Sequence, residues 1–119
     1  DLRGRAPAPF ARDVIPVRFT ATAAAQIAAR RKWWRENRDK APDLFDREYD
    51  DAIEDLGRRA GSLPVFASEG GHAIRRYLMV RTRCHLYFEV IETPAEIRVL
   101  AAGGGQRKRP PRMRLHDAP

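Results

Sequence analysis

The residues best suited to chemistry lie in the last third of the chain, between positions 72 and 111. Three short apolar segments there carry arginine, tyrosine or histidine at alternate positions. Alternate residues of a strand point to opposite faces, so one face would build a core while the other presents Arg75, Tyr87 and their neighbours. Guanidinium groups bind carboxylates and phosphates. The pattern therefore predicts a surface that binds an acidic partner.

Other kinds of site are not indicated by the sequence. One cysteine and three scattered histidines give no metal-ligand spacing, so neither a metal nor another cofactor is expected. The glycines at 103–105 lack the Gly-Lys-Ser/Thr ending of a phosphate loop. Cys84 stands in an apolar alternation, which predicts a buried thiol and a reducing compartment.

Length and charge limit the class of protein. The 119 residues suffice for one small domain with a two-layer core. The net charge is +7, but residues 36–55 hold nine acidic and three basic residues, so the remainder carries +13. This imbalance favours an anionic partner, although basicity that only aids solubility stays open. We expect a cytoplasmic protein, since neither a membrane-spanning apolar run nor a signal peptide is visible.

The first half of the chain predicts a strand and two helices. Residues 14–19 are rich in Val, Ile and Phe, and Thr20 or Thr22 offers an N-cap for a helix that runs to about residue 37. A second helix begins at Pro42 and ends near Gly57 or Gly61. The residues expected in the core are Ala23, Ile27, Trp34, Phe45, Tyr49, Ala52, Ile53 and Leu56, with Trp33 directed outward.

The second half predicts a loop and then three strands. Residues 57–71 are expected to form a loop, followed by strands at 72–80, 84–91 and 96–102 joined by tight turns. The side chains expected to face the helices are Ile74, Leu78, Val80, Cys84, Leu86, Phe88, Val90, Ile97, Val99 and Ala101. The side chains expected on an open face are Arg75, Tyr77, Met79, His85, Tyr87, Glu89, Arg98 and Leu100.

These elements define an α+β fold of order β-α-α-β-β-β, in which a helical hairpin packs on one face of a small curved antiparallel sheet. The domain is expected to span residues 14–106. Residues 1–13 are interpreted as a flexible arm, and residues 107–119 as a basic tail.

Three segments in this order resemble the RelE/ParE superfamily, the toxins of bacterial type II toxin–antitoxin pairs. They are Ala-Pro-Asp-Leu-Phe at 41–45, IRRYLMVRTRCHLYFEV at 74–90 and VLAAGGGQRKRPP at 99–111. The resemblance covers about residues 14–113 and is nearest to the ParE-like branch, which includes plasmid stabilisation proteins. It implies a cognate antitoxin that wraps the toxin. It also implies one of two targets, DNA gyrase for ParE-like members or mRNA on the ribosome for RelE-like members.

The chemistry expected of an mRNA-cleaving member needs a base, an acid and cations around the phosphate. The candidates for these tasks are Arg75, Arg81, Arg83, His85, Tyr87 and Arg107. The chain departs from cleaving members at Ser68–Gly71, where a lysine cluster is common, and at Gly104, where a histidine is common.

We therefore expect a ParE-like toxin that binds its target, with mRNA cleavage as the alternative and an inactive remnant that binds only antitoxin as a third. Arg75 is the first choice for function. The residues expected to contact target or antitoxin are Trp33, Arg75, Tyr77, Arg81, Tyr87, Arg98, Arg107 and Arg109.

Overall fold

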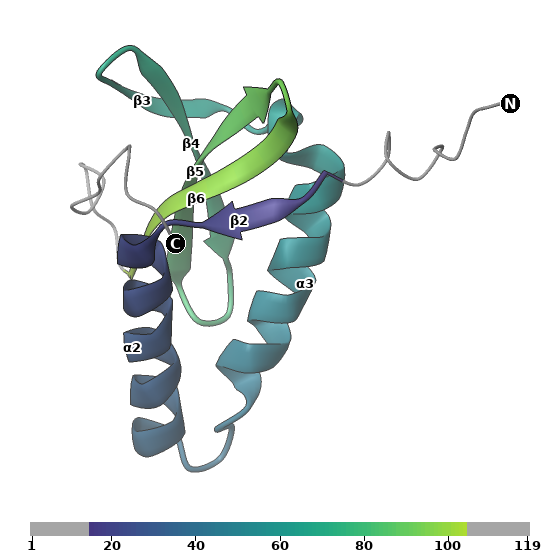
Figure 1. Ribbon diagram of the computed structural model, residues 1–119. Coiled ribbons are helices and arrows are strands. Elements are labelled where there is room, and N and C mark those ends of the chain that lie inside the picture. The colour runs from purple at the N-terminus through teal and green to yellow at the C-terminus, as the bar shows by residue number, and fades with distance from the viewer. Residues whose placement is uncertain (1–14, 105–119) are drawn as a thin grey trace, which may run out of the picture.

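The computed structural model describes residues 15–104 and shows two helices and a sheet (Figure 1). The elements in chain order are β2 (Val17–Phe19), α2 (Ala21–Asn37), α3 (Leu44–Arg59), a 3₁₀ turn (Ala60–Ser62), β3 (Val65–Glu69), β4 (His72–Met79), β5 (Cys84–Glu92) and β6 (Ala95–Gly104). The expected α+β fold, with a helical hairpin on one face of a small sheet, is confirmed. Residues 1–13 and 107–119, interpreted as arm and tail, lie outside the described residues.

The two helices begin and pack as their sequences indicate. Thr20 is the N-cap of α2: its Oγ1 accepts a hydrogen bond from the backbone N–H of Ala23 at 3.1 Å and donates one to the carbonyl of Leu100 at 3.2 Å. Arg31 and Arg35 of α2 both bind the carboxylate of Asp46 in α3. These ion pairs join the N-terminal turn of α3 to the second half of α2.

The sheet has the strand order β2-β6-β5-β4-β3 over the described residues. Neighbouring strands are antiparallel except β2, which runs parallel to β6 with Val17 opposite Ile97 and Phe19 opposite Val99. The sheet is thus mixed, where a purely antiparallel one was expected. The helices and three strands separate β2 from β6 in sequence, so no hairpin forces these two strands into opposite directions.

The loop expected at residues 57–71 is wrong. Residues 60–62 form a 3₁₀ turn and residues 65–69 form β3, an edge strand paired with β4. Gly70 and Gly71 join the two strands with positive φ angles of 55° and 83°. Glycine adopts these angles without steric cost, and a two-residue glycine turn is a hairpin signal that the sequence contains. Figure 1 shows this hairpin extending away from the helices.

The expected orientation of β4 is also wrong. The turn between β4 and β5 pairs Met79 with Cys84, Tyr77 with Leu86 and Arg75 with Phe88. Directly paired residues share a face, so the odd-numbered residues of β4 lie with the even-numbered residues of β5. Arg75, Tyr77 and Met79 therefore face the helices. Ile74, Leu78 and Val80 lie on the opposite side, with Leu78 and Val80 exposed.

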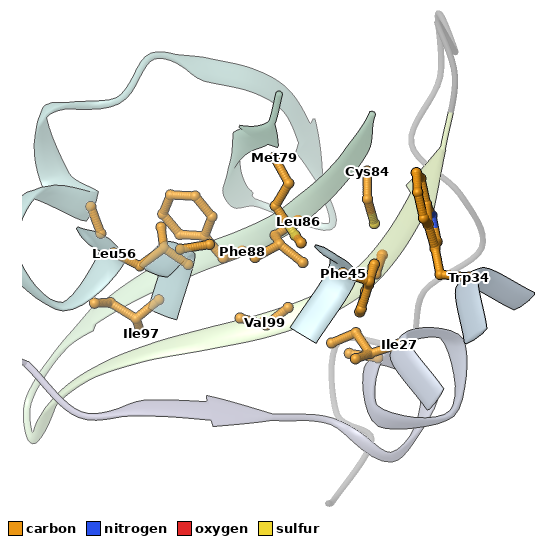
Figure 2. Packing of buried hydrophobic residues seen from close by; sticks show 14 residues of the cluster. Ile27, Trp34, Phe45, Leu56, Met79, Cys84, Leu86, Phe88, Ile97 and Val99 are labelled. Carbon is orange, nitrogen blue, oxygen red and sulfur yellow. The ribbon is translucent and has the colours of Figure 1, made fainter. Parts of the chain in front are cut away.

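The main core lies between the helices and the sheet. As expected, Cys84, Leu86 and Phe88 are fully buried there, together with Ile27, Phe45, Leu56, Ile97 and Val99. Figure 2 shows this cluster running from Leu56 and Ile97 at one end to Trp34 and Cys84 at the other. Neither helix in residues 15–104 is long and apolar enough to cross a membrane.

The sheet face turned away from the helices, here the far face, is not open as expected. Ile74, Tyr87, Leu100 and Ala101 are fully buried in a second, smaller cluster covered by Phe66 of β3. Ala101, expected to face the helices, joins this cluster because the pairing of β5 with β6 shifts by one residue after Tyr87. A β-bulge of this kind inserts one extra residue and changes the face of those that follow.

Candidate functional site

The turn between β4 and β5 is fixed by contacts to both helices. The carboxylate of Glu48 in α3 accepts hydrogen bonds from the backbone N–H of Arg81 at 2.6 Å and from the N–H and hydroxyl of Thr82 at 2.8 and 2.7 Å. From α2, the guanidinium of Arg30 donates to the carbonyl of Thr82 at 3.4 Å. Arg83 follows with a φ of 58°, in the left-handed region. The turn is therefore held at both sides, while Arg81 and Arg83 project into solvent.

A cavity of about 450 Å³ lies between this turn and the end of α2. We name it the turn cavity, and the side chains that define its chemistry are Arg30, Trp33, Trp34, Arg38, Arg81 and Arg83. As expected, Trp34 is buried at 8% exposure while Trp33 is 46% exposed. The guanidinium of Arg38 lies 5.7 Å from the Trp33 ring and 5.3 Å from the Trp34 ring. The turn cavity is therefore basic and aromatic, which suits an anion that carries a planar group.

Arg75 and Tyr77, which were expected on an open face, serve the fold. A guanidinium nitrogen of Arg75 donates to the backbone carbonyl of Leu63. The Tyr77 hydroxyl donates to Asp55 of α3 at 3.0 Å. Burial and this hydrogen bond raise the pKa of Tyr77 to about 12. Both side chains therefore connect β4 to the segment that includes α3 and the start of β3.

The far face separates the other candidates from the turn arginines. His85 is 8% exposed and lines a second cavity of about 360 Å³ together with Arg76. The guanidinium of Arg76, expected among inward residues, lies over the ring of Phe66 at 4.1 Å. Tyr87 is fully buried, and its hydroxyl has no hydrogen-bond partner in the part of the chain that the structure describes. Tyr87 is therefore a packing residue, 5.9 Å from the His85 ring.

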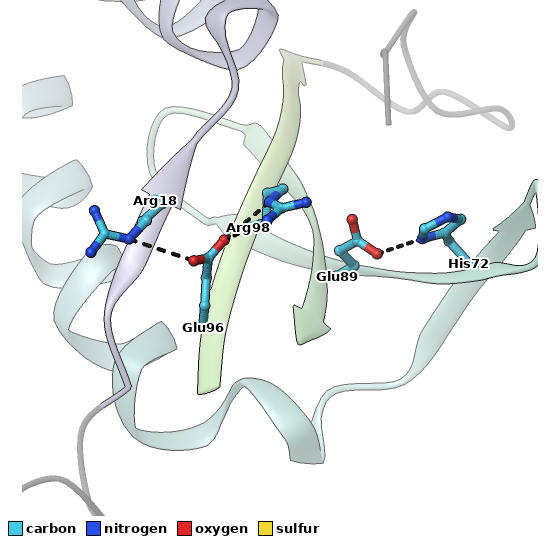
Figure 3. Close-up of polar contacts among 5 residues, drawn as sticks. All are labelled: Arg18, His72, Glu89, Glu96 and Arg98. Atoms are coloured by element: carbon cyan, nitrogen blue, oxygen red, sulfur yellow. Dashed lines mark hydrogen bonds and ion pairs between the residues drawn. The ribbon is translucent and has the colours of Figure 1, made fainter. Parts of the chain in front are cut away.

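The far face also carries two charged groups (Figure 3). Nδ1 of His72 lies 2.7 Å from a carboxylate oxygen of Glu89, which is 7% exposed. Glu96 binds Arg98 at 3.0 Å and Arg18 at 3.5 Å. Arg98, a predicted contact residue, is thus accessible but already paired.

The predicted catalytic residues do not converge on one site. Arg81 and Arg83 line the turn cavity, His85 lines the far-face cavity, and Arg75 lies under the helices. Arg107 and Arg109 lie outside the described residues. Sequence reasoning gave no role to Glu48, Arg30 or Arg38, because each acts through a partner distant in sequence or through the end of a helix. In residues 15–104, no three His, Cys, Asp or Glu side chains form a group that could hold a metal ion.

Comparison with known proteins identifies the fold. No protein-family model matches the sequence, and no curated protein matches it. A solved structure described as the chromosomal ParDE TA system from P. aeruginosa contains a chain that superimposes with a TM-score of 0.62 at 18% identity. The match covers 79% of this chain and 99% of the other. The chain has a ParE/RelE-like toxin fold.

The ParE/RelE-like fold confirms the architecture expected from the three sequence segments. At 18% identity the likeness concerns the course of the backbone. The residues of the turn cavity therefore have to be judged from their own contacts in this chain.

Proposed function

We propose that the protein is the toxin of a type II toxin–antitoxin pair, acts as a ParE-like inhibitor that binds its target, and is neutralised by a cognate antitoxin. The observation that carries the proposal is the superposition on almost the whole length of a chain from a ParDE system. A small basic domain with exposed arginines is also suited to an acidic antitoxin segment. DNA gyrase is the target that this proposal favours.

Binding is proposed over hydrolysis because the acid–base candidates are dispersed. A general acid or base must come within hydrogen-bond distance of the reacting group. Tyr87 is buried, and His85 lies in a different cavity from Arg83. Among the predicted contact residues, Trp33, Arg81 and Arg98 are accessible and remain our proposed contacts to target or antitoxin, together with Arg107 and Arg109.

The alternative, mRNA cleavage on the ribosome, draws support from one observation. His85, Arg76 and the His72–Glu89 pair share the far face, where imidazole, carboxylate and guanidinium groups suited to acid–base work and phosphate binding occur together. His85→Ala separates the two functions. A binding toxin keeps its effect on growth in this variant, whereas an endonuclease that uses His85 loses it.

The proposal is tested by inducing the full chain alone in bacteria that carry one reporter of DNA damage and another of protein synthesis. Gyrase inhibition predicts filamentous cells and activation of the DNA-damage reporter before protein synthesis declines. Rapid loss of protein synthesis with cleaved mRNAs would support the alternative. Normal growth would overturn both proposals and leave the third interpretation, a remnant that binds only an antitoxin.

A further inference from the structure

The arginines of the turn cavity differ from most other arginines of the domain in having no carboxylate partner. Arg18, Arg31, Arg35, Arg58, Arg59 and Arg98 all form ion pairs. Within residues 15–104, none of Arg30, Arg38, Arg81 and Arg83 forms one, although all four line the same cavity. Four like charges in one place repel each other, so an anionic ligand would relieve this repulsion.

The turn cavity also holds hydrogen-bond donors without acceptors. Nε of Arg30 and Nε1 of Trp34 are both buried and lack a partner among the described residues. The hydroxyl of Thr82 is used by Glu48, and its carbonyl is used by Arg30. Since arginine and tryptophan side chains only donate, the lining favours a ligand made of acceptors.

A phosphate diester fits this lining better than a peptide does. A phosphodiester has acceptor oxygens and no donor, whereas each residue of a peptide brings a backbone N–H that needs an acceptor. A cavity of about 450 Å³ falls in the range of small-molecule sites, and the half-exposed indole of Trp33 offers a surface on which a base can stack.

The positive charge continues beyond the cavity in the sequence. Gly104, the last described residue, lies against the guanidinium of Arg30, where an added Cβ would come within 2.5 Å of it. The following residues, 105–119, contain five Arg or Lys and one Asp. A run of charge that begins at the cavity favours a polyanion over a single anionic group.

We propose that the turn cavity binds a nucleotide unit of a single-stranded nucleic acid, with the base against Trp33 and the flanking phosphates on Arg81, Arg83 and Arg38. Arg30 supports the turn that presents these groups. The inference rests on the geometry of the cavity and does not depend on the proposed toxin activity.

Fluorescence of the full chain tests the proposal directly, because its two tryptophans both line the cavity. A short oligothymidylate is expected to quench this fluorescence. Affinity should fall with salt, with a slope of about 0.7 in log K against log concentration for each phosphate bound. Quenching by thymidine monophosphate at the same affinity would identify a free nucleotide as the source of the same chemistry, and much weaker quenching would identify the strand.

Variants show whether binding occurs in the cavity, with anisotropy of a labelled oligothymidylate as the readout. Trp33→Ala should weaken binding about fivefold or more, since stacking on an aromatic side chain contributes that much per base. Arg81→Gln and Arg83→Asn should each weaken binding and lower the salt slope by about 0.7. Asparagine is used at position 83 because it tolerates a positive φ.

The matched control is Arg47→Gln, which removes an exposed arginine that does not line the cavity. It should leave affinity unchanged, and all variants should unfold at the temperature of the unmodified chain. The proposal is overturned if the oligothymidylate does not quench tryptophan fluorescence. It is equally overturned if Arg47→Gln weakens binding as much as Arg81→Gln, or if a glutamate-rich peptide binds the cavity while the oligothymidylate does not.

Discussion

Neighbouring groups decide what each arginine of this domain does. Arg75 and Arg81 stand six positions apart in one hairpin, yet Arg75 donates to the carbonyl of Leu63 while Arg81 projects from the turn. Sequence reasoning chose Arg75 as the main functional residue because it assigned β4 the wrong orientation. The correct choice needed the pairing of Met79 with Cys84, which depends on the length of the turn between them.

Truncating Phe88 tests the orientation of β5 and the main core. Phe88 is fully buried among residues from the helices and the sheet, so Phe88→Ala should lower the free energy of unfolding by about 3–5 kcal/mol. Leu78→Ala is the control, because Leu78 is 38% exposed on the far face and its truncation should cost under about 1 kcal/mol. Chemical denaturation of both variants would contradict this account if their losses were equal.

Acid should remove the stabilisation that two carboxylates provide. A hydrogen bond from Arg59, opposed by burial and helped by Tyr77, lowers the pKa of Asp55 below its ordinary 3.8. Burial acts to raise the pKa of Asp46, but hydrogen bonds from Arg35 and Arg31 outweigh it and lower that pKa as well. A lowered folded-state pKa stabilises the fold fully above the ordinary value and loses this effect as the pH falls through the folded-state value.

The measurement is the denaturation midpoint of the full chain from about pH 5 to about pH 2, compared with that of Asp55→Asn. The variant lacks one of the two carboxylates, so its midpoint should fall less steeply in this range. Parallel curves for the two proteins would mean that Asp55 contributes nothing to acid sensitivity.

At the scale of elements, the parts that local sequence determines were predictable. The N-cap Thr20, the buried stripe of α3 and the alternation of β5 each follow from neighbouring residues. The parts that depend on pairing were not. The bulge that places both Leu100 and Ala101 on the far face has no local signal, and β3 was missed although Gly70-Gly71 marked its turn. Glu48 contacts the turn across 33 and 34 positions, which no local pattern reveals.

Glu48 should matter to the turn more than its position on an exposed acidic helix implies. Glu48→Ala leaves three donors of Arg81 and Thr82 without their acceptor, and hydrogen bonds to a charged group contribute about 1.5–3 kcal/mol. Chemical denaturation should show a loss of this size, with faster hydrogen exchange at the two turn amides.

The control for Glu48 is Glu54→Ala, which removes an exposed carboxylate paired only with Arg58 one helical turn away. Such pairs contribute about 0.3–0.5 kcal/mol. Equal losses in the two variants, or unchanged exchange at Arg81 and Thr82, would show that the carboxylate of Glu48 does not hold the turn.

At the scale of the whole molecule, charge and fold indicate the same class of function. The acidic residues of α3 are partly neutralised by arginines of α2 and of α3 itself, while the arginines of the turn cavity keep their charge uncompensated. A domain that leaves its cations free at one end is suited to anionic partners. This arrangement agrees with the ParE/RelE-like fold and with a toxin that acts by contact.

The most direct test of the toxin proposal is a viable count after the full chain is induced alone and again together with the small protein encoded by the adjacent gene. The proposal predicts that the chain alone lowers the count by orders of magnitude and that co-expression restores it. Unchanged viability with the chain alone, at expression levels where the folded protein is present, would contradict the proposed function.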